Sequence, residues 1–179
     1  MTKFLVKKDY IIHLKQLCSV EKTRFYLMGI LFERDSGCMV ATDGHRLGMY
    51  KNAFPAGAIK EDLIIDFSKS FISQLKKLSK KIDYIEIEIT DNFDVKYEGE
   101  TCGMVIDGTF PNWRRVCPQL NNAKTVKIDE IGFNMQYLES FGRFPQVTFY
   151  ESNGGAQVIL GIKLWQNPDF MGVLMPMRI

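Results

Sequence analysis

One structural pattern occurs three times along this chain of 179 residues: a strand, a helix, and then hairpin strands. The copies begin at intervals of roughly 60 residues, which indicates internal repetition. A single βαβββ unit exposes a sheet edge and needs a neighbour to cover it. Two units make one α+β domain, so three make one and a half. The predicted fold class is therefore α+β, built of repeated βαβββ half-domains, about three in this chain.

Hydrophobic periodicity places the elements of the first two units. In the first unit, residues 3–6 form a predicted strand and 10–18 a helix. Residues 24–32 and 39–50 form strands joined by a turn at 34–37. In the second unit, residues 63–67 form a strand, Ser68 is the N-cap of a helix reaching about Lys81, and 84–90 alternate as in a half-buried strand. Turns at 91–92 and 98–99 then separate two more strands.

The third unit is predicted from the same kinds of signal. Residues 126–133 form a strand, and Asn134 caps a short helix that ends near residue 144. Two more strands follow, with turn signals at 152–155 and 167–169. The connectors are 52–61 and 107–124. The second contains Trp113 and two arginines, which favours a packed linker.

Composition excludes several classes of protein. With 46% hydrophobic and 25% charged residues, the chain is typical of a soluble globular protein. It has no apolar run near the ~20 residues of a membrane helix, and its start lacks a signal peptide, so we expect a cytoplasmic protein. The four cysteines form no CxxC pair, so we expect neither a metal site nor a disulfide framework, and no cofactor. A net charge of +2 excludes a strongly basic DNA-coating protein but permits a local basic face.

Three segments, in order along the chain, resemble segments of the bacterial sliding clamp, the β subunit of DNA polymerase III. They are VATDGHRL at 40–47, GTFPNWRRV at 108–116 and LMPMRI at 174–179. The resemblance implies a DNA-clamp fold and a DNA-binding processivity factor without catalytic residues. Residues 1–106 resemble the family's middle domain, 107–124 are a linker, and 125–179 resemble the second half of its last domain. The rest of a full-length clamp has no counterpart here, which puts the standard dimeric ring in doubt.

In this family a groove between the middle and last domains receives short peptides from polymerases and clamp loaders. Apolar residues can build its floor, prolines its walls, and Gly44 permits a close backbone approach. Methionines adapt to several ligands, although such residues are equally typical of an interdomain core. The groove residues implied by the resemblance are Leu27, Thr42, Gly44, His45, Arg46, Leu47, Pro111, Arg115, Val116, Val173, Leu174, Met175, Pro176, Met177, Arg178 and Ile179.

A lysine-rich face on the second predicted helix indicates double-stranded DNA as a second partner. Such a face could neutralise phosphates without reading bases, although a merely solvated helix face has the same composition. The candidate lysines are Lys69, Lys76, Lys77, Lys80 and Lys81, with Lys8 and Lys15 from the first helix.

Two other functional hypotheses compete with that of a processivity clamp. A peptide-binding module that never encircles DNA would keep the groove and compete for clamp-binding partners. An enzyme would need a partner for His45, but His13 is the only other histidine and falls on a predicted helix. Asp43 and Gly44 fit a tight turn equally well. The sequence leaves open the oligomeric state (monomer, non-circular dimer or four-chain ring), the polymerase served, and a host or phage origin.

Overall fold

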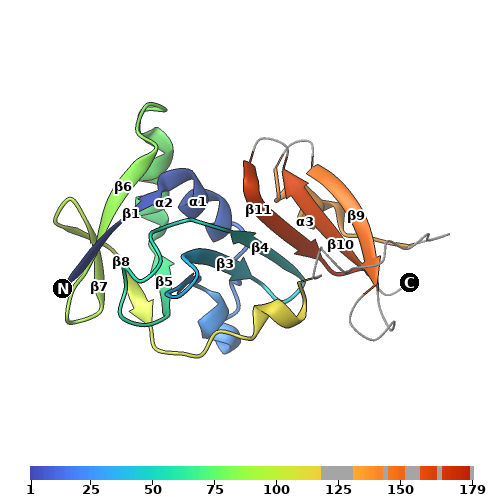
Figure 1. Cartoon of the computed structure of the whole chain (residues 1–179), viewed down its shortest axis with the longest axis horizontal. Coiled ribbons are helices and arrows are strands. Elements are labelled where there is room, and N and C mark those ends of the chain that lie inside the picture. Colours follow the sequence, from blue (N-terminus) through green and yellow to red (C-terminus); the bar gives the residue numbers. More distant parts are fainter. Residues whose placement is uncertain (118–130, 143–144, 152–157, 165–166, 178–179) are drawn as a thin grey trace.

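The computed structural model describes residues 1–117, 131–142, 145–151, 158–164 and 167–177. Its elements combine antiparallel strands with short helices (Figure 1). In chain order they are β1 (Thr2–Lys7), α1 (Lys8–Lys15), η1 (Lys22–Leu27), β2 (Ile30–Glu33), β3 (Cys38–Thr42), β4 (Arg46–Tyr50), β5 (Leu63–Phe67), α2 (Lys69–Lys77), β6 (Tyr84–Ile89), β7 (Asp94–Tyr97), β8 (Glu100–Ile106), η2 (Trp113–Arg115), α3 (Met135–Glu139), β9 (Pro145–Glu151), β10 (Val158–Leu164) and β11 (Asn167–Leu174).

The strands form one sheet in the order β1-β6-β7-β8-β5-β2-β3-β4-β11-β10-β9. The first two units exchange their first strands: β1 pairs with β6, and β5 pairs with β2. Each unit therefore completes the sheet of the other, which explains why neither needs to fold alone. The third group of strands joins at the other end, where β11 pairs with β4 through residues 170–174 and 46–50.

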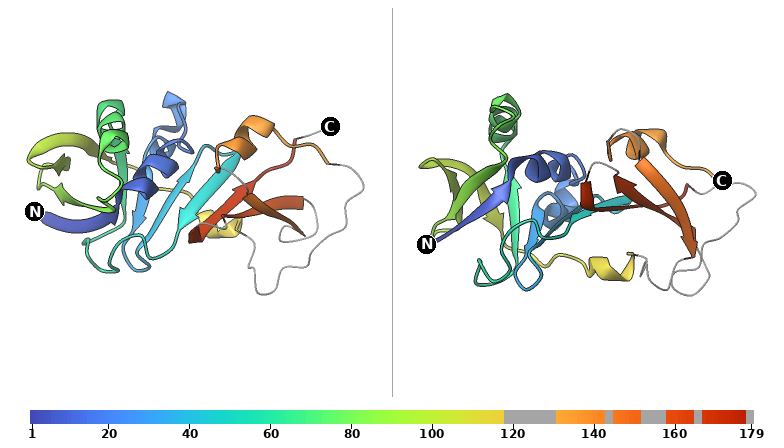
Figure 2. Two further views of the ribbon diagram at one scale, coloured as in Figure 1. Left: turned by 90° about the horizontal axis from the view of Figure 1, so that it is seen from above. Right: turned by 45° about the horizontal axis from the view of Figure 1, so that its top comes forward.

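Alternation along the strands divides the core between the two faces of the sheet. Ile30 and Phe32 of β2 face the cluster that contains α1 and α2, whereas Leu31 faces a second cluster that contains Trp113. The helices cover the first face through residues that are at most 2% exposed, such as Leu14, Phe71 and Leu75. Figure 2 shows α1, α2 and α3 on one side of the sheet and η2 on the other.

The mixed fold and most predicted elements are confirmed, but several boundaries differ. Residues 24–27 belong to η1, and the strand begins only at Ile30, because β-propensity is overridden here by local turns such as Met28 N–H to Phe25 O at 2.9 Å. The predicted strand 39–50 is a hairpin, β3 and β4. The turn signal at 167–169 lies inside β11, so the third group has three strands after its helix, where two were predicted.

The second predicted helix is shorter than expected. Its N-cap is confirmed, since the Ser68 hydroxyl accepts a hydrogen bond from Phe71 N–H at 3.1 Å. The helix ends at Lys77, and Leu78 is already extended. The predicted strand 126–133 lies mostly outside the described residues, and 131–133 are not in a strand, so the count of three half-domains stays a prediction. No helix of the described residues is long and apolar enough to cross a membrane.

Candidate functional site

An apolar pocket lies where the β3–β4 turn, β11 and the segment 107–117 meet; we call it the junction pocket. Its volume is about 190 Å³, below the ~300 Å³ from which pockets accommodate a drug-sized ligand. The size therefore suits one or two anchoring side chains. The lining residues are Leu27, Thr42, Gly44, His45, Arg46, Leu47, Phe110, Pro111, Asn112, Trp113, Val116, Val173 and Met175.

Most of the groove residues implied by the family resemblance line this pocket, although they come from four distant segments. They are Leu27, Thr42, Gly44, His45, Arg46, Leu47, Pro111, Val116, Val173 and Met175. Sequence reasoning missed Phe110, Asn112 and Trp113. All three lie inside the 108–116 segment that was singled out, so the segment itself was the available signal.

The remaining predicted groove residues lie elsewhere. Alternation along β11 puts Val173 in the pocket and Leu174, which is fully buried, in the cluster on the opposite face. Arg115, Pro176 and Met177 are outside the lining, and Met177 is 55% exposed, so it does not contribute to an apolar floor. Arg178 and Ile179 are outside the described residues.

The turn between β3 and β4 forms one rim of the pocket and is held by Asp43. Its carboxylate accepts hydrogen bonds from the backbone N–H of His45 at 2.9 Å and of Arg46 at 3.0 Å. It also pairs with the Arg46 guanidinium at 3.0 Å, with both side chains only 13% exposed. Gly44 has φ +93°, a conformation that L side chains rarely adopt. Asp43 therefore has a structural role here, organising the turn.

The opposite rim is attached to this turn through the backbone. Val173 pairs with Leu47 in the β4–β11 ladder, and Met175 N–H donates to His45 O at 3.0 Å. His13, the other histidine, lies on α1, where its Nδ1 contacts the Tyr50 hydroxyl at 2.6 Å and its Nε2 contacts Ser140 O at 3.2 Å. The two histidines are thus engaged separately, and the described residues contain no cluster of three or more His, Cys, Asp or Glu that could hold a metal.

The predicted DNA-contacting lysines divide into two groups. Lys69, Lys76, Lys77, Lys80 and Lys81 are exposed on α2 and the turn after it. Lys8 is only 5% exposed and its ammonium donates to Ser79 O at 2.8 Å, while Lys15 donates to Met28 O and pairs with Asp66. Contrary to expectation, Lys8 is therefore engaged inside the fold. Lys15 is paired with Asp66 but stays partly exposed, in a pocket that Lys69 and Lys76 also line.

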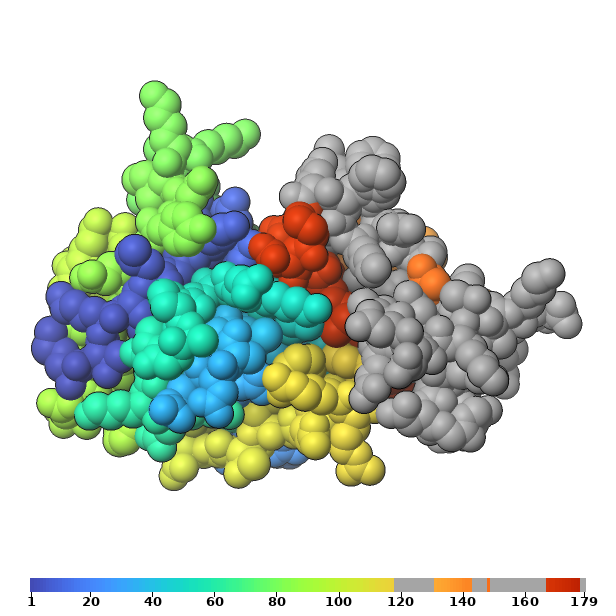
Figure 3. Space-filling view, viewed as in Figure 1, coloured from blue at the N-terminus to red at the C-terminus, as the bar shows by residue number. Residues whose placement is uncertain are grey.

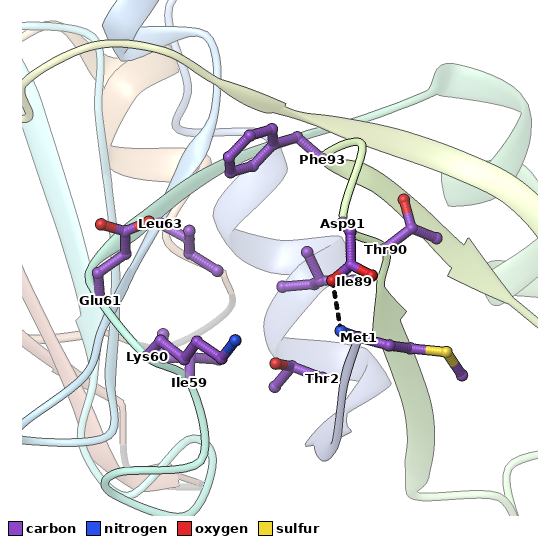
Figure 4. Close-up of a pocket in the computed structure, with 10 residues that line it drawn as sticks. All are labelled: Met1, Thr2, Ile59, Lys60, Glu61, Leu63, Ile89, Thr90, Asp91 and Phe93. Carbon is purple, nitrogen blue, oxygen red and sulfur yellow. Dashed lines mark hydrogen bonds and ion pairs between the residues drawn. The ribbon is translucent and has the colours of Figure 1, made fainter.

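A second pocket, of about 230 Å³, lies between β1, the β6–β7 turn and the loop before β5 (Figure 4). Lys60, Glu61 and Phe93 line it, and on the side opposite Lys60 and Glu61 the backbone nitrogen of Met1 lies 2.6 Å from Asp91 Oδ1. No residue predicted for either partner lines this pocket. The junction pocket, lined by ten of the predicted groove residues, is the candidate peptide site, whereas another pocket is lined by three of the predicted DNA-contacting lysines, Lys15, Lys69 and Lys76.

Comparison with known proteins decides the family. Residues 7–112, from the end of β1 to just before η2, match the family model described as "DNA polymerase III beta subunit, central domain". The chain belongs to the DNA polymerase III beta subunit family. Among sliding clamps of known sequence, that of Caulobacter vibrioides is 30% identical over 120 residues, which are 62% of this chain and 32% of that protein. That of Vibrio cholerae is 31% identical over 112 residues, 60% of this chain and 30% of that protein.

Solved clamp structures share the fold of the described part of the chain. The β subunit of Borrelia burgdorferi in complex with a natural product superposes with a TM-score of 0.72 and 14% identity, covering 100% of this chain and 65% of that one. The Bartonella birtlesii sliding clamp bound to griselimycin gives 0.69 and 23%, covering 99% and 66%. Against the sliding clamps of known sequence, the matching part is about a third of their length.

Proposed function

We propose that the chain is a non-catalytic accessory subunit of a DNA polymerase that docks short peptides of polymerases and clamp loaders in the junction pocket. One observation carries the proposal: ten residues that the family resemblance put forward, from four distant segments, line a single apolar pocket. A shared core would bury these side chains without leaving a cavity between them. Here the cavity is open, and its rim consists of the turn residues His45 and Arg46.

The chemistry of the pocket fits an apolar anchor residue of a peptide. Leu47 and Val173, at most 3% exposed, form a rigid floor, and Met175 adds an adaptable side chain that can follow different ligands. Buried anchors contribute most of the affinity of such contacts. A short peptide of the glutamine-plus-leucine/phenylalanine kind would supply one anchor and hydrogen-bonding groups for the rim.

DNA is the second proposed partner. Lys69 and Lys76 lie on the solvent side of α2, opposite the buried Phe71 and Leu75, and Lys80 follows in the next turn. Ammonium groups contact phosphates as point charges and read no sequence. This suits a protein that must move along double-stranded DNA.

Titration calorimetry with such a peptide tests the docking proposal. The intact chain should bind, and Met175→Ala should weaken binding more than tenfold, since truncating a buried anchor costs ~2 kcal/mol or more. Met177→Ala is the matched control, because it removes the same side chain two residues away, outside the pocket, and should change little. Absence of binding, or equal losses in both variants, would rule the pocket out as the docking site.

A second candidate is a peptide-binding module that docks the same peptides without encircling DNA. The burial of Lys8, one of the lysines proposed for DNA contact, favours this candidate, since its ammonium donates to Ser79 O inside the fold. Light scattering with and without DNA separates the two candidates. A closed ring retained on circular DNA supports the clamp, whereas a monomer that dissociates from circular DNA supports the module.

A further inference from the structure

The segment 107–117, which we call the wall segment, carries one side of the junction pocket and is linked to the sheet by an ion pair. The Arg114 guanidinium donates two hydrogen bonds to the two carboxylate oxygens of Glu33, the last residue of β2. The carboxylate also accepts from the Ser36 hydroxyl. Figure 3 shows the wall segment, in yellow, against the light-blue residues of the β2–β3 hairpin.

The ion pair also contacts a residue of the junction pocket, Trp113. Trp113 lines the junction pocket and is 7% exposed, and the Arg114 guanidinium carbon lies 4.2 Å from the centre of its ring. The indole Nε1–H is buried and has no partner with hydrogen-bond geometry among the described residues. Trp113 is thus held on one ring face by the cation.

At neutral pH Glu33 is ionised and Arg114 is protonated. The hydrogen bonds from Arg114 hold the pKa of Glu33 below its ordinary value, against the burial that raises it. The same contact raises the pKa of Arg114. Only 12% of the Glu33 side chain is exposed, so this carboxylate depends on its partner for compensation, whereas Arg114 remains 54% exposed.

Other polar contacts of the wall segment are local where the structure describes them. Arg115 N–H donates to Asn112 O and Val116 N–H donates to Trp113 O, both at 3.2 Å, and both bonds stay inside the segment. The ladder between β8 and β5 ends at Ile106, directly before the segment begins. Trp113, Cys117 and the partly buried Phe110 also attach the segment by packing in the second cluster.

We infer that Glu33 and Arg114 are positioning residues for peptide docking: their two-pronged ion pair fixes Trp113 and so sets the distance between the wall segment and the β3–β4 rim. This inference rests on the proposed function. Neither residue lines the pocket, so their effect on an occupant passes through the indole. Without the ion pair, the wall segment is free to shift as a unit. Part of the binding free energy of the peptide is then used to bring the segment back into position.

A double-mutant cycle in peptide titrations tests the coupling. Glu33→Gln and Arg114→Gln should each weaken binding about threefold to tenfold, and the double variant should be no weaker than either single one, because all three lack the same contact. Arg114→Lys keeps a cation near the ring but loses the fork and should be intermediate. Arg34→Gln is the matched control, since it removes the exposed neighbouring pair with Asp35 and should leave affinity unchanged.

A spectroscopic readout follows the indole without peptide. In a Trp165→Phe background, Trp113 is the only tryptophan, and acrylamide should quench its fluorescence more strongly in Glu33→Gln than in the parent. Additive losses, unchanged affinity or unchanged quenching would each overturn the inference while leaving peptide docking intact. Failure of the unmodified chain to bind peptide would instead overturn the proposed function, and the positioning role with it.

Discussion

The Tyr137 ring of α3 lies nearly parallel to the His45 imidazole, with ring centroids 5.7 Å apart and an interplanar angle of 18°. The Arg46 guanidinium carbon lies 4.8 Å from the same ring. One aromatic side chain from the third group of elements therefore contacts two residues of the pocket rim. The rim is thus supported from outside the unit that contains it.

Replacing Tyr137 tests this support. Tyr137→Ala removes the stack and the cation–π contact and should lower the free energy of unfolding by about 1 kcal/mol. Tyr137→Phe retains the ring and should be close to the unmodified chain. Urea denaturation of the two variants measures the difference, and equal stabilities would show that the ring contacts contribute nothing.

Gly44 offers a test of backbone conformation at the rim. A Cβ there would come within 2.5 Å of the Arg24 Nη1 atom, the far end of a flexible side chain that can move away. The left-handed backbone, with φ +93°, should therefore determine the cost of Gly44→Ala, about 1 kcal/mol. Gly57 is the matched control, since it has φ +76° and open space around it. Thermal or urea unfolding should give similar losses of unfolding free energy for the two alanine variants. A much larger loss at Gly44 would mean that the Arg24 side chain cannot move away.

Stability should depend on pH through His13. Burial lowers the pKa of His13 from 6.5, so the unfolded chain takes up a proton at a higher pH than the folded chain. The contribution is therefore complete above pH 6.5 and is lost as the pH falls below that value towards the lowered pKa. His13→Gln should flatten the dependence of unfolding free energy on pH between about 5 and 7. A slope that persists in the variant would assign the effect to other groups.

Binding to DNA should depend on charge and not on sequence. Lys69, Lys76 and Lys80 replaced together by glutamate should abolish retention on double-stranded DNA and leave peptide titrations unchanged. In the unmodified chain, affinity should fall steeply with salt. The control replaces Arg34, Lys51 and Lys60, which are equally exposed but lie on turns outside α2. Equal losses in both triple variants would reduce the effect to net charge, and sequence-selective binding would contradict the model.

Features with a local cause were predictable from the sequence. The N-cap Ser68 and the alternating strand at 84–89 are encoded by neighbouring residues, and both are confirmed. The burial of Lys8 and the ion pair of Lys15 were not predictable, because their partners, Ser79 and Asp66, lie 71 and 51 residues away. Helical periodicity places a lysine on a helix but does not show what faces it.

In the candidate site, too, local features were predictable and features set by tertiary pairing were not. The family resemblance predicted ten pocket residues, but it did not reveal that Trp113 completes the lining or that Leu174 turns away from it. Whether a side chain faces the pocket depends on the register of β11 against β4. That register is set by tertiary pairing, and a shift of one residue would exchange the two faces.

The β4–β11 ladder joins residues 46–50 to residues 170–174, and the pocket has walls on both strands. A bound peptide therefore stabilises the pairing of β4 with β11, because separating the two strands would also release the peptide. At a free peptide concentration of 100 times Kd, separation becomes harder by about 2.7 kcal/mol. Amide exchange in β11 should slow by roughly a hundredfold under those conditions. A polymerase peptide bound in the junction pocket would thus stabilise the contact between the two parts of the sheet.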